Sequence, residues 1–335
     1  MNHKSAEPSG QLPLSPQQYA AYDLYLKGQY FWNKRTVEGF QQAIEYFQRA
    51  AEADPTDARA YVGLADSYAL IGGYSVRPPA EFMRQARAAA LRALELDQGS
   101  AEAHTALALI VQNYDWDWQT AEREFRRAIE LNPNYATAHH WYAEHLMWRG
   151  RFDEALGESE RARQLDPLSL IIAADRGAIF YYSRQYDRAI EQFRAVRELD
   201  PNFSRTGLIE QAYEQKGQFA DALAEAEKGH PDRDHPYQPW YWSWQAYIYG
   251  RMGQRAAAQH ALEELEKLNR RQEVDASLFV AAYVGLSDKD QAFAWLEKAY
   301  TQHSNLITSL KVDPYLDPLR DDPRFRDLLH RAGLD

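Results

Sequence analysis

The 335-residue sequence contains no cysteine. Without thiols the chain forms no disulfide, offers no thiolate to zinc and has no cysteine nucleophile. Its fold must therefore be held together by packing. The chain is 45% hydrophobic and long enough to bury about three quarters of its unfolded surface.

Long apolar runs are also missing. The best one, Leu168 to Ala174, falls well short of the roughly 18 residues that cross a bilayer. The opening stretch, MNHKSAEPSGQLPLSPQQ, has no apolar core, so we expect residues 1–18 to be a flexible linker and not a signal peptide. We expect no membrane span and a cytoplasmic location, or a periplasmic one if the chain is part of a membrane-anchored regulator.

Positive charge is scarce. The chain has 38 Lys and Arg residues against 49 Asp and Glu residues, for a net charge of −11, and no block of basic residues. Binding to nucleic acid needs a basic stripe that neutralises phosphates. We therefore expect no direct nucleic-acid partner.

Motifs of catalysis are absent as well: the sequence has no GxGxxG, no Walker A loop, no nucleophile elbow and no HExxH helix. The Asp-x-Asp pair in YDWDWQ, residues 114–119, resembles a metal-nucleotide motif, but that motif works only within a nucleotide-binding fold. The favoured interpretation is that Asp115 or Asp117 caps a helix while Trp116 and Trp118 fill the turn before it. We expect a non-enzymatic protein without a cofactor.

What the sequence does contain is a repeat. Asp-Pro or Asn-Pro pairs end at Pro55, Pro133, Pro167 and Pro201, and the last three prolines follow one another at intervals of 34 residues. Upstream of these prolines lie small residues seven apart with a third residue between them: Ala43, Phe47 and Ala50; Ala86, Ala90 and Ala93; Ala121, Phe125 and Ala128; Ala155, Ser159 and Ala162; Ala189, Phe193 and Val196.

The spacing i, i+4, i+7 places each triplet on one face of a helix. Small residues there let a neighbouring helix come close, and the proline stops the helix because it has no backbone N–H. A second apolar set precedes each triplet, such as Tyr61, Leu64, Ala65 and Tyr68. Each unit is therefore predicted to be two antiparallel helices, which must stack on other units to bury their apolar faces.

The pattern resembles the tetratricopeptide repeat (TPR), with its motif W-x2-L-G-x2-Y, then A-x3-F-x2-A, then P. Residues 136–201 match it best, and the resemblance extends over about eight units. It implies an all-α, right-handed superhelix over residues 19–304. Insertions interrupt it around Trp32–Thr36, in IGGYSVRPPAEFM and in GHPDRDHPYQP.

The end of the chain, residues 305–335, is predicted to form a helical cap. In DPYLDPLRDDPRFRDLLHRAGL, Asp313, Asp317 and Asp322 each precede a proline, which is typical of a helix start. The last of these helices carries Phe325, Leu328 and Leu329 on one face. We expect it to cover the apolar face that the final repeat would otherwise expose.

Three segments resemble a narrower group: AYDLYLKGQYFWNKRT, YDWDWQTAEREFRRAIELNPNYATAHHWYAEH and DPYLDPLRDDPRF are similar to bacterial TPR regions that follow winged-helix, serine/threonine kinase or adenylate cyclase domains. None of those effector domains is visible in this sequence. The resemblance motivates a second hypothesis beside an interaction scaffold, namely a sensory or regulatory module of a larger signalling protein.

The stretch HHWYAEH, residues 139–145, suggests a metal site, a catalytic cluster or an ordinary helical turn. His139 takes a packing position in the TPR frame, and only His140 and Glu144 share a helical side. Two ligands do not make a structural zinc site, so we expect no metal here. HPDRDH, residues 230–235, has two histidines and two aspartates that could hold a cation. Loops rich in Asp, His and Pro are more often turns, so we expect a turn with adventitious cation binding at most.

In this family the concave groove is lined by defined positions of each first helix. Aromatics with polar ends among amides and charges, found at those positions here, are typical of protein-binding surfaces. The candidate groove residues are His140, Glu144, Met147, Trp148, Asp175, Tyr181 and Tyr182 in units four and five, and Tyr25, Trp32, Trp240 and Tyr247 in units one and seven.

These positions predict a protein or peptide partner, and they leave homo-oligomerisation open. The alternative is that many of these aromatics are core residues of the stack. The family's clamp for acidic chaperone tails needs a lysine at the fifth position of a first helix. The eight positions hold no lysine: they are Tyr25, Val62, Thr105, His140, Ala174, Gly207, Ser243 and Ser277.

Overall fold

The protein is described here by a computed structural model, which covers residues 15–74, 80–201, 203, 205–229, 238–271 and 273–335. Every regular element in these ranges is helical. The elements are α1 (Pro16–Trp32), α2 (Val37–Ala53), α3 (Ala58–Tyr74), α4 (Ala80–Leu96), α5 (Ala101–Ile110), the π-helical turn η1 (Val111–Asp115), α6 (Trp118–Leu131), α7 (Ala136–Trp148), α8 (Phe152–Leu165), α9 (Leu170–Tyr182), α10 (Tyr186–Leu199), α11 (Leu208–Gln215), α12 (Phe219–Gly229), α13 (Gln238–Arg251), α14 (Arg255–Arg271), α15 (Ser277–Gly285), α16 (Lys289–Thr301), α17 (Leu306–Ser309), the 3-10 helix η2 (Pro314–Leu319) and α18 (Pro323–Arg331).

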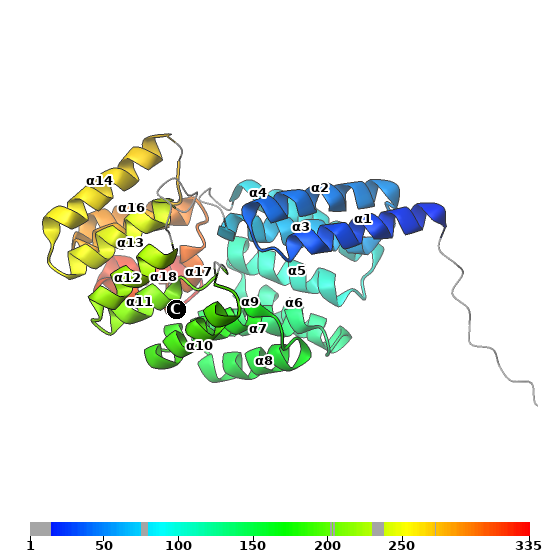
Figure 1. Cartoon of the computed structure of the whole chain (residues 1–335). Coiled ribbons are helices and arrows are strands. Elements are labelled where there is room, and N and C mark those ends of the chain that lie inside the picture. Colours follow the sequence, from blue (N-terminus) through cyan, green and yellow to red (C-terminus); the bar gives the residue numbers. More distant parts are fainter. Residues whose placement is uncertain (1–14, 75–79, 202, 204, 230–237, 272) are drawn as a thin grey trace, which may run out of the picture.

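The helices from α1 to α16 form eight antiparallel hairpins, in which each odd-numbered helix packs on the even-numbered helix that follows it. The hairpins stack in sequence order around a curved superhelix (Figure 1). This arrangement confirms the all-α TPR-like architecture. Of the linker expected over residues 1–18, residues 1–14 lie outside the described residues, and α1 already begins at Pro16.

The small-residue triplets lie where helices meet. The outer two residues of the first triplet, Ala43 and Ala50, are at most 1% exposed, and Phe47 between them is fully buried. The ring of Phe47 fits against glycines of two inner helices, since a Cβ on Gly28 or Gly63 would lie 2.5 Å from it. Gly177 receives the ring of Phe193 in the same way in the fifth hairpin. A phenylalanine of each such outer helix thus fills a hole made by glycine, and this contact sets how closely the hairpins approach.

The predicted helix ends are also where the sequence places them. α2, α6, α8 and α10 end two residues before Pro55, Pro133, Pro167 and Pro201 respectively. Asp117, one of the two expected caps in YDWDWQ, accepts a hydrogen bond from the backbone N–H of Thr120 at 3.0 Å and begins α6. The loop prediction for HPDRDH lies outside the described residues.

The C-terminal segment does more than cover the last hairpin. Arg324 and Arg331 of α18 pair with Asp290 and Glu297 of α16, as expected for a cap. The same segment also reaches the middle of the chain, where the indole of Trp118 donates a hydrogen bond to the Ala332 carbonyl at 2.7 Å. The C-terminus consequently lies toward the middle of the molecule in Figure 1.

Further contacts along this segment close the superhelix on itself. Arg184 donates to the Val312 carbonyl at 2.8 Å and pairs with Asp317. The ring of His303 stacks between those of Tyr114 and Trp116. The two tryptophans of YDWDWQ therefore hold the end of the chain, beyond their expected role in the turn.

One detail of the predicted cap is wrong. Asp313 and Asp322 are N-caps of η2 and α18, but Asp317 lies inside η2 and starts no helix. The reason is that its carboxylate is engaged by Arg184 and by Arg320, which leaves η2 running through Pro318.

The tightest helix contact predicts a stability effect. A Cβ on Gly285 would lie 2.4 Å from the Cα of Tyr247, because α13 and α15 touch backbone to backbone there. We expect Gly285→Ala to lower the free energy of unfolding by about 3 kcal/mol, since the helices must separate to admit the methyl group. Gly157→Ala is the matched control: nothing lies near its Cβ position, and we expect a gain of about 1 kcal/mol from helix propensity. Urea unfolding of both variants measures the difference, and equal stabilities would contradict the close contact.

The hydrogen bond between Trp118 and Ala332 predicts an effect on the stability of the C-terminal segment. Trp118→Phe keeps an aromatic ring but removes the indole N–H that donates to the buried Ala332 carbonyl, and the unpaired carbonyl costs about 1–3 kcal/mol. We expect faster amide hydrogen exchange over residues 320–335, with exchange in α1 and α2 unchanged as the internal control. Unchanged protection at the C-terminus would show that the closure does not depend on this bond.

Candidate functional site

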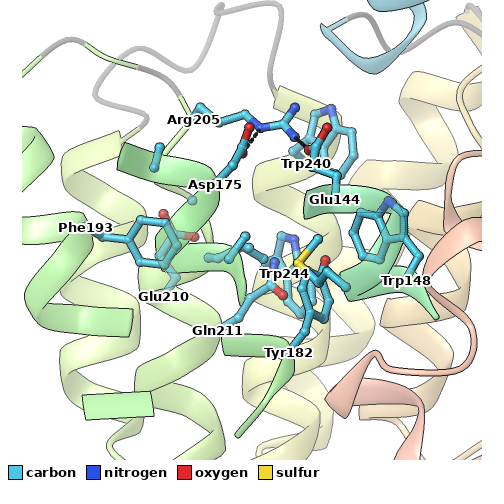
Figure 2. A pocket seen from close by; sticks show the side chains of 15 residues that line it. Glu144, Trp148, Asp175, Tyr182, Phe193, Arg205, Glu210, Gln211, Trp240 and Trp244 are labelled. Atoms are coloured by element: carbon cyan, nitrogen blue, oxygen red, sulfur yellow. Dashed lines mark hydrogen bonds and ion pairs between the residues drawn. The ribbon is translucent and has the colours of Figure 1, made fainter. Parts of the chain in front are cut away.

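The inner helices enclose a cavity of about 290 Å³, called the inner cavity below. It is lined by Glu144, Met147, Trp148, Ala174, Asp175, Ala178, Tyr182, Phe193, Arg205, Gly207, Leu208, Glu210, Gln211, Trp240 and Trp244. Most of these residues come from α7, α9, α11 and α13, each the first helix of its hairpin (Figure 2). The cavity exists because these four helices face one another across the concave side.

One wall of the inner cavity is a polar cluster. His140 of α7 and Asp175 of α9 are both buried, with His140 Nε2 2.7 Å from Asp175 Oδ2. Arg205, which precedes α11, donates from Nε to Asp175 Oδ1 at 3.1 Å and from Nη2 to Glu144 Oε1 at 3.2 Å. Figure 2 shows the guanidinium spanning the two carboxylates at one end of the cavity.

The two carboxylates respond differently to this setting. Burial opposes the ionisation of Asp175, but the Arg205 guanidinium and the bond from His140 outweigh it and hold the pKa of Asp175 below its ordinary value. Burial and the neighbouring charge of Asp175 raise the pKa of Glu144. Asp175 is therefore the fixed anion of the cluster, and Glu144 is the group that gains a proton more readily.

The cluster brings together more groups than the sequence predicted. Counting ligands on the helix of residues 139–145 gave His140 and Glu144 alone, whereas Asp175 of the next hairpin supplies a third candidate ligand atom, all within 4.8 Å of one another. Counting ligands along one helix misses Asp175, because it lies on the first helix of the next hairpin. The positive charge beside these groups is the guanidinium of Arg205.

The opposite walls of the inner cavity are aromatic. Trp148 meets Tyr182 edge to face, with ring centroids 4.9 Å apart. Trp240 and Trp244 lie one turn apart on α13, and Trp244 packs edge to face on Tyr247 behind it. All three tryptophans are only partly buried, so part of each indole borders the cavity.

Glu210 of α11 also lines the cavity, beside Phe193 (Figure 2). It is 6% exposed, and burial raises the pKa of its carboxyl to about 8 against the attraction of Arg197. At neutral pH this carboxyl is therefore largely protonated when the cavity is empty.

A second compartment of about 310 Å³ adjoins the inner cavity and shares Trp148, Tyr182, Arg205 and Trp240 with it. Its far side consists of Asp275, small hydroxyl residues of α15 and α17, and Asp313 and Tyr315 of the C-terminal segment. Burial raises the pKa of Asp313 to about 7. The closing segment thus forms a wall of the concave interior.

The candidate groove residues fall into two groups. Those that line the inner cavity are Glu144, Met147, Trp148, Asp175, Tyr182 and Trp240. The others lie elsewhere: Tyr181 and Tyr247 are fully buried between helices, His140 stands behind Asp175, and Tyr25 and Trp32 pack in the first hairpin.

The sequence reasoning missed Arg205, Glu210 and Trp244 as site residues. Trp244 had a signal, since it follows Trp240 by four residues and shares its helical side. Glu210 follows Asp175 by 35 residues, close to the repeat period, and so occupies an equivalent inner position. Arg205 precedes α11 outside the regular pattern, and nothing in the sequence marked it.

Comparison with known proteins supports the fold. Sequence models of the tetratricopeptide repeat match residues 25–74 and residues 117–171. Among curated proteins, the transcriptional regulator HilA of Salmonella typhimurium is 26% identical over 167 residues, which are 50% of this chain and 30% of that protein. The Hsp70-Hsp90 organizing protein 2 of Arabidopsis thaliana is 32% identical over 82 residues, 24% of this chain and 14% of its own length.

The chain thus spans less than a third of either curated relative. Solved structures similar to it include the Cut9-Hcn1 hetero-tetramer of the APC/C, with a TM-score of 0.62, 15% identity, and coverage of 95% of this chain and 57% of that one. A human IFIT1 dimer with PPP-AAAA has a TM-score of 0.59 and 17% identity, covering 79% and 69% of the two chains. At these identities the structures show the fold alone. The two matching repeat models show that this chain contains tetratricopeptide repeats, and its stacked hairpins with buried alanine and phenylalanine positions have the corresponding fold.

Proposed function

We propose that the chain is a non-enzymatic interaction scaffold that holds a segment of a partner protein against its concave face, with the inner cavity as the anchor point. The observation that carries this proposal is the cavity itself. It sets three partly exposed tryptophans beside charged side chains, the combination typical of binding hot spots. Repeats of this family indicate a protein-interaction module.

The geometry also limits what the segment is. The enclosed volume of about 290 Å³ is at the lower end for ligand sites, so it suits one side chain of the partner and not a length of its backbone. The absence of a clamp lysine and the carboxyls of the interior argue against an acidic chaperone tail, although one relative is named as an Hsp70-Hsp90 organizing protein. The rest of the segment would lie along the inner helices.

Replacing tryptophan in the cavity wall should weaken binding without unfolding the chain. We expect Trp148→Ala and Trp240→Ala each to lower affinity for the partner about tenfold, since a hot-spot aromatic contributes about 2 kcal/mol. The partner is first identified by photo-crosslinking from a benzoylphenylalanine placed at Gln211, and its affinity is then measured by titration.

Tyr30→Ala is the matched control, because Tyr30 is an aromatic that is 63% exposed in α1 and does not line the cavity. Circular dichroism melts establish that all three variants are folded. Equal losses in the control and the cavity variants, or no loss in either cavity variant, would rule out the inner cavity as the anchor.

A second candidate function is a regulatory module of a larger signalling or transcription-regulatory protein. It is favoured by the match of half of the chain to the transcriptional regulator HilA, of which this chain covers 30%. This candidate predicts that the chain's gene encodes an effector domain in the same reading frame. The effector domain and these repeats would then share one polypeptide, and Trp240→Ala should alter the activity of the effector domain. An unchanged activity would contradict this candidate.

A further inference from the structure

The concave interior holds more acidic groups than basic ones. Among the described residues that line the two compartments, five carry carboxyl groups: Glu144, Asp175, Glu210, Asp275 and Asp313. One lining residue, Arg205, carries a positive charge. A partly open cavity lined in this way favours a cation over an anion, because a positive charge beside the carboxyls stabilises their ionised forms.

Arg205 donates hydrogen bonds to Asp175 and Glu144, and the second carboxylate oxygen of Asp175 lies 2.7 Å from His140 Nε2. The carboxyl of Glu210 borders the same cavity, and the residue is 6% exposed. Burial raises the pKa of this carboxyl, so a positive group that entered the cavity would favour its ionisation.

The charged and titratable groups around Glu210 are engaged with other partners or are acidic themselves. Behind it, Arg197 of α10 is paired with Glu225 of α12, so that its charge is already shared. On the cavity side stand Glu144 of α7, Asp175 of α9, with His140 behind it, and Arg205. None of these supplies a donor to Glu210.

The remaining walls fit the same kind of ligand. The indole and phenol rings of Trp148, Tyr182, Trp240 and Trp244 surround the space between the carboxyls. Aromatic faces attract organic cations, and guanidinium groups above all stack on them. A buried carboxyl and partly exposed aromatic rings in one cavity match a positive group carried on an apolar stem.

We propose that the inner cavity binds the side chain of an arginine from the partner segment, with its guanidinium set against Glu210 and its stem beside the tryptophans. This proposal rests on the proposed function in that it takes the segment on the concave face as the source of the arginine. It adds the chemistry of the anchor, which the proposed function leaves undefined.

Binding should be linked to a proton. The Glu210 carboxyl, with a pKa of about 8, holds its proton when the cavity is empty, and an entering guanidinium favours the carboxylate. The free protein then binds more protons than the complex, so affinity increases with pH toward about 8 and levels off above it. The raised pKa of Glu144 contributes in the same direction.

The test uses the whole chain and three probes: the pentapeptide Gly-Gly-Arg-Gly-Gly with blocked ends, the same peptide with citrulline in place of arginine, and agmatine. Tryptophan fluorescence and calorimetry at several pH values give the affinities. We expect the arginine peptide to bind at least about tenfold more tightly than the neutral citrulline peptide, and to release a proton near neutral pH.

Glu210→Gln should lower affinity for the arginine peptide about tenfold and remove the increase with pH, since it keeps the shape of the protonated acid but cannot ionise. Glu191→Gln, the same exchange at an exposed position of α10, is the matched control and should change neither. Thermal melts check that both variants fold.

The outcomes separate the arginine proposal from the scaffold function. Equal affinities of the arginine and citrulline peptides, or an unchanged affinity in Glu210→Gln, would overturn the proposal. Agmatine carries the same guanidinium and stem, so we expect it to bind about as tightly as the arginine peptide, and no binding of agmatine would contradict a cavity that recognises the side chain alone. If photo-crosslinking from Gln211 finds a partner segment without arginine, the scaffold function stands and this inference fails, so the two are separable.

Discussion

The interior of this protein depends on the contact between the end of the chain and its middle. The hydrogen bond from Trp118 to the Ala332 carbonyl, with the ion pair between Arg184 and Asp317, holds the C-terminal segment across the superhelix. A stack of hairpins without this segment would have an open groove. With it, Asp313 and Tyr315 become a wall, and the groove becomes an enclosed space with two connected compartments.

Enclosure changes the chemistry of the side chains inside. A carboxyl in an open groove keeps its ordinary pKa, whereas burial raises the pKa of Glu210 to about 8 and that of Asp313 to about 7. Asp175 escapes this only because Arg205 and His140 stabilise its charged form. The interior is thus poised to take up a compensating positive charge, which is the basis of the arginine proposal.

Packing and recognition share the same helices. The inner helices pack on their partners through glycine and alanine, as where Gly177 receives Phe193, and this leaves their other sides for larger residues such as Trp148 and Trp240. Two neighbouring histidines of α7 show these two roles. His139 bridges Glu158 and the Pro133 carbonyl within its own hairpin, whereas its neighbour His140 reaches Asp175 in the next one.

The sequence by itself determined the hairpins, because their signals are local: a small-residue triplet at i, i+4 and i+7, a proline two residues after the helix end, and an Asp cap at Asp117. It also marked about half of the cavity wall, since groove positions recur with the repeat. Only the tertiary structure decided that Asp175 joins His140 and Glu144, that Arg205 lies across them, and that Trp118 meets Ala332 from 214 residues away. Those contacts depend on how far the stack curves and where its end docks. Both are sums of many small packing angles, and no local pattern in the sequence encodes them.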